Sequence, residues 1–293
     1  MQQQKSFAPL ENRGTLYLVG TPIGNLEDMT VRAVHTLQAV DVIAAEDTRH
    51  TRKLTNYFDI HVPLVSYHEH NQQKQGDVLL KRLLQGEAVA LVSDAGLPAI
   101  SDPGSALVAT AIAHDIPVVP IPGANAALSA LIASGLPTDH FLFLGFLPRE
   151  RKACRRELQQ WRDISATLLL YEAPHRLLST LALIADEWGN RQAAVARELT
   201  KRHEEWLRGT IDELVVWFEQ HPPRGECSLA IEGNASEVAA EEELPWWHAL
   251  SLEAHVAHWI AEGASSRDAI QKVAVERNMK KRDVYNYYHR RHE

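Results

Sequence analysis

The stretch Gly14-Thr-Leu-Tyr-Leu-Val-Gly-Thr-Pro-Ile-Gly24-Asn-Leu26 decides the fold prediction, because an apolar strand in it runs directly into a loop of glycine and proline. Gly20, Pro22 and Gly24 make a rigid turn in which backbone can lie close to a ligand. The loop has neither the Gly-Lys-Ser/Thr of a Walker loop nor the G-x-G-x-x-G of a dinucleotide-binding loop. The segment therefore predicts a ligand site at a strand end and excludes the two commonest mononucleotide fingerprints.

Short apolar strands alternate with helical patterns through the first half of the chain, which predicts a parallel, doubly wound α/β sheet. The expected strands are residues 15–19, 41–45, 62–65, 88–92 and 117–121. Ligands of such sheets bind beyond the carboxyl ends of the strands. Four special loops are expected at that edge and form the candidate site, namely residues 20–24, 45–49, 93–98 and 121–125.

The pattern changes after Pro137 and predicts a second α/β domain with a mixed sheet. Its expected strands are residues 141–144, 167–171, 193–197 and 227–231, and its helices 151–162, 175–187 and 211–219. Three short helices then follow at 246–262, 266–277 and 282–291, in a helix-turn-helix-like arrangement, with Ser265 or Ser266 at an N-cap position. The expected organisation is an unstructured tail over 1–13, α/β domains over 14–135 and 136–233, an acidic linker over 234–245 and a helical domain over 246–293.

Composition limits the classes of function. The 293 residues carry a formal net charge of -8, which excludes a protein that coats nucleic acid with its whole surface. The sequence shows no signal peptide and no long apolar window, so a cytoplasmic location is expected. Cys154 and Cys227 lack partners at metal-ligand spacing, which predicts reduced thiols. Two basic stretches, each equally well explained as a solvated helix face, are Arg149, Arg151, Lys152, Arg155, Arg156 and Arg277, Lys280, Lys281, Arg282, Arg290, Arg291.

Polar residues at the strand ends supply the candidate chemistry. Asp94 lies near Gly96, where a carboxylate accepts hydrogen bonds from ribose hydroxyls or an ammonium group. Asp102 precedes Pro103 as an N-cap precedes the first helical residue, so we expect Asp102 to cap a helix. His68-Glu69-His70 lacks further ligands at metal spacing, and no metal site is predicted. Ionisable and polar residues at the same strand ends could supply a base or support a reacting anion, but ion-paired structural networks would give the same residues. They are Glu46, Asp47, Arg49, His50, Glu172, His175, Arg176, Arg197, Glu198, Thr200 and Lys201.

Eight short motifs carry a family likeness when they are taken in order along the chain. They are Thr21-Pro-Ile-Gly-Asn-Leu26, Ala45-Glu-Asp-Thr-Arg-His-Thr51, Ser66-Tyr-His-Glu-His-Asn71, Leu91-Val-Ser-Asp-Ala-Gly96 with Ser101-Asp-Pro-Gly104, Pro120-Ile-Pro-Gly123, Gly145-Phe-Leu-Pro148, Tyr171-Glu172 with His175-Arg176, and Ala196-Arg-Glu-Leu-Thr-Lys201. Together, over residues 14–233, they resemble the bacterial 16S rRNA (cytidine-2'-O)-methyltransferases of the tetrapyrrole methylase superfamily. Leu97 departs from the usual threonine of that family, and Ala124-Asn125 from its usual proline and small residue.

This resemblance implies S-adenosylmethionine held folded between two α/β domains, a homodimer, and methyl transfer to the ribose 2'-hydroxyl of a decoding-centre cytidine in 16S rRNA. The implied donor-site residues are Pro22, Gly24, Asn25, Asp94, Ala95, Gly96, Leu97, Pro122, Gly123 and Asn125. Transfer from a sulfonium needs alignment, exclusion of water and removal of one proton, and it needs no metal. We expect Asp47, Glu172, Glu198 and Lys201 near the transferred methyl group. RNA contacts are expected from Arg49, Arg197, Lys280, Lys281, Arg282, Tyr285, Arg290 and Arg291.

Two other functions stay open at this point. A C-methylase acting on a corrin or porphyrin precursor would share the donor loops, but it gives no reason for a basic helical tail. A non-catalytic RNA-binding or ribosome-assembly protein would fit a donor site altered at Leu97 and Asn125.

Overall fold

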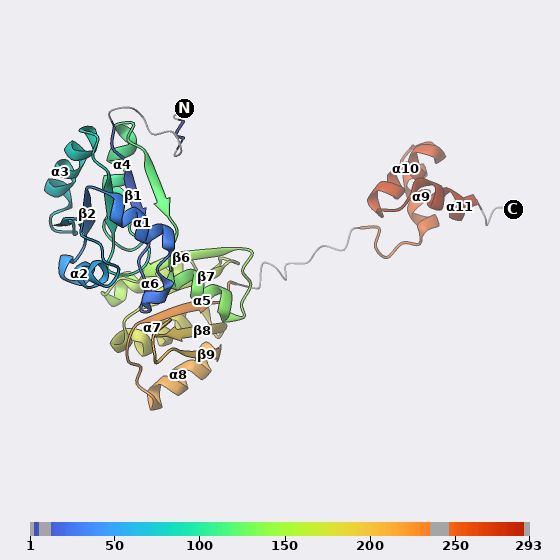
Figure 1. Ribbon diagram of the computed structural model, residues 1–293. Helices are drawn as coiled ribbons and strands as arrows, with labels where there is room; N and C mark the ends of the chain where they lie inside the picture. The colour runs from blue at the N-terminus through green and yellow to red at the C-terminus, as the bar shows by residue number, and fades with distance from the viewer. Residues whose placement is uncertain (1–2, 6–12, 235–245, 290–293) are drawn as a thin grey trace. The chain divides into compact units, whose positions relative to one another are not determined.

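The computed structural model describes residues 3–5, 13–234 and 246–289, which belong to two compact units, residues 1–234 and 235–293 (Figure 1). The first unit contains two five-stranded sheets, and the second contains helices. The predicted fold class, with a parallel first sheet, a mixed second sheet and C-terminal helices, is confirmed. The linker predicted for 234–245 lies outside the described residues except for Asn234. Across the described ranges, no helix is both long enough and apolar enough to cross a membrane.

The first sheet has the strand order β3-β2-β4-β1-β5, and all its pairings are parallel. Ile43 and Ala45 pack on one face with α1 and α2, while Val42 and Ala44 pack on the other with α3 and α4. Covered faces explain why the strands read as continuous apolar runs. The strands are β1 (Leu16–Val19), β2 (Val42–Ala45), β3 (Leu64–Ser66), β4 (Val89–Val92) and β5 (Val118–Ile121); the helices are η1 (Leu26–Asp28), α1 (Val31–Ala39), α2 (Thr48–Tyr57), α3 (Gln72–Leu84) and α4 (Ser105–Ala113).

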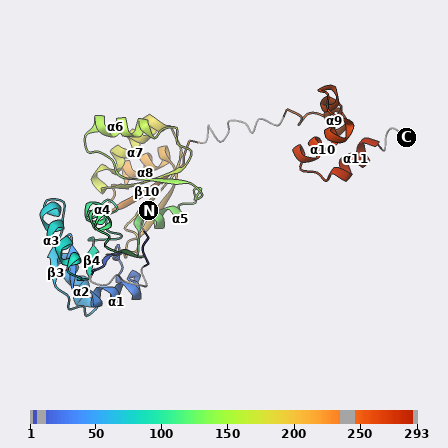
Figure 2. The same ribbon diagram turned by 90° about the horizontal axis from the view of Figure 1, so that it is seen from above.

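The second sheet has the order β6-β7-β10-β8-β9, with β6 parallel to β7 and the other pairs antiparallel. Helices α6, α7 and α8 cover one face, and α5 packs on the other through Ala127 and Leu131 (Figure 2). The strands are β6 (Phe141–Phe146), β7 (Thr167–Glu172), β8 (Gln192–Arg197), β9 (Glu205–Thr210) and β10 (Cys227–Ile231); the helices are α5 (Ala126–Ser134), α6 (Arg151–Gln160), α7 (Pro174–Trp188) and α8 (Ile211–Gln220).

Besides the short helix η1, three elements of the structure were absent from the sequence prediction. Helix α2 is mostly polar, and its side chains Leu54 and Thr55 are buried against the first sheet without a strong apolar pattern. Helix α5 consists largely of small residues, and its weak amphipathic pattern hides the face that packs on the second sheet. Strand β9 pairs only with β8 and has no fully buried residue, so it shows little of the apolar alternation that identifies a strand.

The C-terminal unit consists of α9 (Leu252–Ala261), α10 (Ser266–Glu276) and α11 (Lys281–His289). Val256, Ile270, Val273 and Val284 are buried between these helices. Ser265 accepts a hydrogen bond from the Asp268 N–H, so the predicted N-cap is confirmed at that residue. The first helix begins at Leu252, six residues later than the expected start at 246.

Helix α8 begins with a reciprocal cap. Thr210 Oγ1 accepts a hydrogen bond from the Glu213 N–H, and Glu213 Oε2 accepts one from the Thr210 N–H at 2.8 Å. We expect Thr210→Ala to lower the free energy of unfolding by about 1 kcal/mol in urea denaturation. The Glu213 N–H loses its hydrogen-bond partner, and the Glu213 carboxylate, which accepts from the Thr210 N–H, loses the Thr210 hydroxyl that positions it. Thr36→Ala is the matched control, since the Thr36 hydroxyl bonds only within its own helix, to Arg32 O. An equal loss in both variants would contradict this account.

Candidate active site

The loops that follow β1, β4 and β5 meet at one edge of the first sheet because these strands are parallel. The Thr21 N–H donates to Gly96 O at 2.8 Å and the Gly96 N–H donates to Thr21 O at 3.1 Å. Thr21 Oγ1 also donates to Ser93 O at 3.2 Å, and the Thr21 side chain is buried. A Cβ added to Gly123 would lie 2.9 Å from Gly20 Cα. The three predicted donor loops are therefore joined backbone to backbone.

A cavity of about 440 Å³ opens between these loops and the second sheet. This volume lies within the range of small-molecule sites. Half of the predicted donor-site residues line it, namely Asp94, Ala95, Gly96, Leu97 and Asn125. The other half, Pro22, Gly24, Asn25, Pro122 and Gly123, do not line it.

The predicted residues outside the cavity wall have structural contacts of their own. Asn25 Oδ1 accepts a hydrogen bond from the Glu27 N–H and caps η1. A Cβ at Gly24 would lie 2.4 Å from Lys201 Cγ, so the absence of a side chain there makes room for Lys201. Asn125 combines both situations, since it lines the cavity and its Oδ1 accepts from the Leu128 N–H at 2.8 Å to cap α5.

The polar lining of the cavity is acidic. Its ionisable carboxyl groups belong to Glu46, Asp94, Asp102, Glu172 and Glu226, and none of the described residues that line it is Lys or Arg. Burial, followed by the charge of Asp94, raises the pKa of Glu46. Burial also raises the pKa of the Cys227 thiol to about 12, so this lining residue is no nucleophile at neutral pH. The arrangement suits a cationic ligand.

Asp102 does not cap a helix, contrary to the sequence prediction. Helix α4 begins at Ser105 and has Gly104 at its N-cap, where φ is 149° and few residues other than glycine fit. Asp102 instead lines the cavity. Burial and the charges of Glu46 and Asp94 raise its pKa to about 6, and a hydrogen bond with Ser93 only partly offsets them. The prediction from the Asp-Pro pattern was wrong because Pro103 and Gly104 still belong to the loop and the helix begins at Ser105.

Glu172 lines the cavity, but its carboxylate is engaged elsewhere. Its side chain is 1% exposed, Oε1 accepts from the Ala173 N–H at 2.9 Å, and Oε2 accepts from Thr180 Oγ1 at 2.6 Å. Arg176 Nε lies 3.4 Å from Oε1, and Arg176 also donates to the carbonyls of Leu147 and Pro148. These contacts fix the start of α7 against the end of β6.

Asp47 does not line the cavity, and its carboxylate caps α2. Hydrogen bonds from the side chain and the backbone of Arg49 hold the pKa of Asp47 far below its usual range. The Asp47 N–H donates to Asp94 Oδ1 at 3.0 Å. Asp47 and Arg49 thus form one exposed pair next to Asp94, which does line the cavity.

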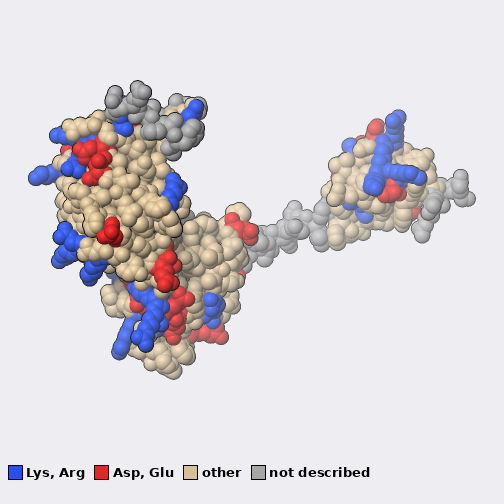
Figure 3. All heavy atoms as spheres, viewed as in Figure 1, with Lys and Arg blue, Asp and Glu red and all other residues tan. Residues whose placement is uncertain are grey.

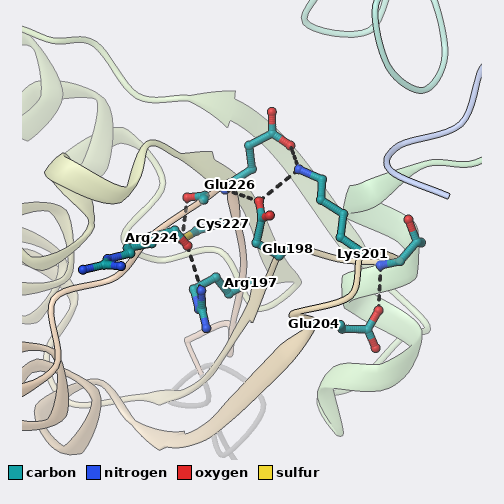
Figure 4. A network of polar contacts seen from close by, with 9 residues as sticks. Arg197, Glu198, Lys201, Glu204, Arg224, Glu226 and Cys227 are labelled. Carbon is teal, nitrogen blue, oxygen red and sulfur yellow. Dashed lines mark hydrogen bonds and ion pairs between the residues drawn. The ribbon is translucent and has the colours of Figure 1, made fainter.

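Glu198 and Lys201 belong to a polar network at the start of β10 (Figure 4). Lys201 Nζ lies 2.9 Å from both Glu198 Oε1 and Glu226 Oε2, and the Glu226 N–H donates to Glu198 Oε1 at 3.0 Å. Burial acts to raise the pKa of Glu198, but these hydrogen bonds and the charges of Lys201 and Arg197 outweigh it and lower the pKa. Neither Glu198 nor Lys201 lines the cavity, whereas Glu226 does.

Arg197 pairs with Glu205 across β8 and β9, with Nη2 at 2.7 Å from Oε2, and it donates to Arg224 O at 3.0 Å. Its side chain is 20% exposed. The guanidinium therefore already has partners within the protein. Arg49, by contrast, is 88% exposed although it is paired with Asp47.

The start of β10 was missed as part of the site. Cys227 pairs with Glu172 on β7 and with Arg197 on β8, both in antiparallel register. The beginning of β10 therefore lies beside the ends of its neighbours and brings Glu226 and Ser228 to the cavity. The sequence analysis considered the carboxyl ends of strands, which is where ligands bind in parallel sheets. In the antiparallel strand β10, the residues at the cavity lie instead at the amino-terminal end.

Of the basic residues predicted at the C-terminus, Lys281 and Arg282 begin α11 and Lys280 directly precedes it. Lys280, Lys281 and Arg282 are exposed, and Tyr285 is 52% exposed on the same helix. Figure 3 shows Lys and Arg gathered on the visible face of this unit, whereas both signs of charge are interspersed on the first unit. Arg290 and Arg291 lie outside the described residues.

Residues 15–215 match the family described as Tetrapyrrole (Corrin/Porphyrin) Methylases, the class to which this pair of sheets and the cavity between them point. A solved uroporphyrin-III C-methyltransferase of Thermus thermophilus, complexed with S-adenyl homocysteine, shares the fold with a TM-score of 0.52 at 20% identity, over 77% of this chain and 100% of that one. The likeness to that structure concerns the fold alone.

Two relatives match nearly the whole chain, and both are named Ribosomal RNA small subunit methyltransferase I. The protein of Halalkalibacterium halodurans is 54% identical over 99% of each chain, and that of Bacillus subtilis is 51% identical over 99% of each chain. The chain therefore belongs to the ribosomal RNA small subunit methyltransferase I family, a branch of the tetrapyrrole methylases.

The close approach of Gly20 and Gly123 gives a test of the loop arrangement. We expect Gly123→Ala to lower the free energy of unfolding by about 1–3 kcal/mol, because the new Cβ meets backbone that cannot rotate away. Gly76→Ala is the control, since a Cβ in that position of α3 has only an ordinary contact, 3.9 Å from Tyr67, and improves helix propensity by up to about 1 kcal/mol. Urea denaturation of both variants measures the difference, and an unchanged Gly123→Ala would contradict the close packing.

Proposed function

We propose that this protein transfers a methyl group from S-adenosylmethionine to the ribose 2'-hydroxyl of a decoding-centre cytidine in 16S rRNA. The observation that carries the proposal is the 54% identity, over 99% of both chains, to a ribosomal RNA small subunit methyltransferase I. The acidic cavity at the strand ends supports it further, because a sulfonium donor is cationic and is stabilised by negative potential.

The donor would be held by the loop after β4 and by the start of α5. Asp94 to Leu97 and Asn125 line the cavity, and Gly96 exposes backbone there without a side chain. The other predicted donor-site residues would act indirectly, by fixing the positions of these loops. They are Pro22, Gly24, Asn25, Pro122 and Gly123. S-adenosylmethionine supplies an electrophilic methyl carbon, so the protein has to align the acceptor, exclude water and remove one proton.

The four residues expected near the methyl group would serve mainly by positioning. Lys201 and Glu198 hold Glu226 against the cavity, and Glu172 holds the start of α7. Asp47 orients Asp94 through its backbone N–H. Each carboxylate accepts hydrogen bonds in the folded protein, which fixes its position.

The RNA would be bound by the C-terminal unit, with Lys280, Lys281 and Arg282 on phosphates and Tyr285 stacked on a base. Arg49 would add an interaction beside the cavity, because its guanidinium is 88% exposed. Arg197, paired with Glu205, would contribute by fixing the edge strand. We further propose a homodimer, which light scattering on the purified protein tests.

The activity is tested with purified protein, isotopically labelled S-adenosylmethionine and small ribosomal subunits from cells that lack this protein. We expect label in 16S rRNA at a ribose whose 2'-O-methyl group blocks alkaline cleavage of the adjacent phosphodiester, with mass spectrometry of the nucleosides identifying the base. Label in a tetrapyrrole precursor, offered in a parallel reaction, would favour the C-methylase alternative. Absence of binding in a calorimetric titration with the donor would favour a non-catalytic RNA-binding protein.

The basic end of α11 gives a separate test. We expect simultaneous replacement of Lys280, Lys281 and Arg282 by alanine to weaken binding to the small subunit. The salt dependence of the affinity should also fall, by about one unit of slope for each phosphate that the variant no longer neutralises. The control is the double alanine variant of Lys74 and Lys81, which are exposed on α3 of the first unit. Equal salt slopes for both variants and the parent would assign the tail to packing.

A further inference from the structure

We infer that residues 146–152, the β6–α6 segment, bind the RNA strand that carries the acceptor nucleotide. Phe146 stacks on a base at the opening of the cavity. Arg149, Arg151 and Lys152 contact the phosphates next to that base. The inference rests on the proposed function and deepens it, because it names a surface of the first unit that holds the substrate.

Phe146 is an aromatic residue of the cavity wall that stays open to solvent. It lines the cavity, and yet it is 57% exposed. Tyr171, another lining residue, supports its ring, with the two ring centroids 5.5 Å apart. The Tyr171 hydroxyl accepts a hydrogen bond from the Ala127 N–H at 3.1 Å, which fixes that support. An exposed aromatic ring held in this way can stack on an unstacked base, the form in which proteins bind single-stranded RNA.

The β6–α6 segment also carries cations without a partner among the described residues. The side chains of Arg149, Arg151 and Lys152 are exposed and make no hydrogen bond or ion pair with the described part of the chain. Glu150 lies between them, and its carboxylate oxygens accept hydrogen bonds from the N–H groups of Lys152 and Ala153. The acidic residue of the segment is therefore engaged in capping α6, and the cations outnumber it.

Arg155, on the same helix, shows how a cation of α6 is neutralised within the protein. Its Nε lies 2.6 Å from Glu187 Oε1, and its Nη2 lies 3.4 Å from Asp186 Oδ2, both on α7. The cations of the β6–α6 segment form no such pair with the described residues. Their charge is therefore available to an anionic partner.

A second cavity, of about 340 Å³, lies between the start of α6 and α7. Its wall includes Arg149, Arg151 and Arg176, whereas Asp186 is the one acidic residue among its described lining residues. Arg176 donates to Pro148 O at 3.1 Å and so fixes the chain directly before Arg149. Such a lining suits a phosphate, because a guanidinium group can donate two parallel hydrogen bonds to phosphate oxygens.

The two cavities adjoin along two stretches of chain. Phe146 lines the first and Arg149 the second, and three residues span at most about 11 Å. At the start of α7, Pro174 lines the first cavity and Arg176 the second. The first cavity has no Lys or Arg among its described lining residues, so the phosphates of a bound strand have to be held outside it. The β6–α6 segment supplies cations for this directly after an aromatic ring of the wall.

The stacking role is tested with Phe146→Ala in the full-length protein, using small ribosomal subunits and labelled S-adenosylmethionine. We expect the KM for the subunits to rise by about 5- to 150-fold, the loss that follows removal of one base–aromatic stack. Phe146→Trp, which keeps an aromatic face, should have a KM close to that of the parent. Affinity for S-adenosylhomocysteine, measured by calorimetry, should stay within a few-fold in both variants, because the proposed function assigns the donor to other loops.

Phe141→Ala is the matched control for this variant. Phe141 lies on the same strand and is 45% exposed, but it does not line the cavity. We expect a parent-like KM for Phe141→Ala, and Tm measurements should show that both alanine variants are folded. A parent-like KM for Phe146→Ala, or an equal rise in both variants, would overturn the inference.

The phosphate contacts are tested by simultaneous replacement of the three cations of the β6–α6 segment by alanine. The affinity for small subunits should fall, and its salt dependence should lose about 0.7–0.9 of slope for each phosphate contact removed. The control variant removes the same amount of charge from α1 and α3, by alanine at the exposed residues Arg32, Lys74 and Lys81. A general effect of net charge would weaken both variants equally, whereas a phosphate site at the β6–α6 segment weakens only the first.

The outcomes separate this inference from the proposed function. Equal salt slopes for the parent, the triple variant and its control would show that the cations form a solvated helix face, and would overturn the inference while the function stands. A difference seen with whole subunits and absent with protein-free 16S rRNA would overturn it in favour of a ribosomal protein as the partner. A parent protein that transfers no label to ribosomal RNA would overturn the proposed function, and this inference with it.

Discussion

The backbone pairing between the loops after β1 and β4 is the constraint on which the cavity depends. Thr21 and Gly96 exchange two hydrogen bonds, and the Thr21 hydroxyl adds a third bond, to Ser93. Gly20 then lies so close to Gly123 that the loop after β5 joins the same assembly. Because the strands are parallel and paired in fixed register, a shift of β1 would move all three loops together. The wall of the site is thus as rigid as the sheet that carries it.

The parallel sheet and its loops could be predicted because their signals are local. Apolar runs, glycine, proline and helical spacing all act within a few residues, and they correctly located β1, β4, β5 and the loops after them. The position of Asp102 could not be predicted in the same way. Asp-Pro fits a helix start, but the loop continues to Gly104, and it packs through Ser101 against Gly145, more than forty residues away in the sequence.

Whether a residue lines the cavity or supports its wall also depends on contacts between residues that are distant in the sequence. Glu198 and Lys201 stand in one short sequence motif, and the motif resembles that of a family, but sequence does not say that Lys201 bonds Glu226. That bond needs the antiparallel register of β10 beside β8. A motif therefore shows which charged residues lie near one another in sequence, whereas the distinction between lining the cavity and supporting its wall depends on strand pairings between distant parts of the chain.

Charge is distributed differently at the cavity and at the start of α11. A negative cavity stabilises a cationic donor, and the same potential repels the phosphates of an approaching RNA. The proposed function therefore places the positive charge for the RNA elsewhere, at Lys280, Lys281 and Arg282 at the start of α11, in a chain whose net charge is -8. Helix α11 packs in the C-terminal unit on a buried apolar core that contains Val256, Ile270, Val273 and Val284. The proposed function thus assigns the cationic donor to the acidic cavity and the polyanionic RNA to the basic residues of the C-terminal unit.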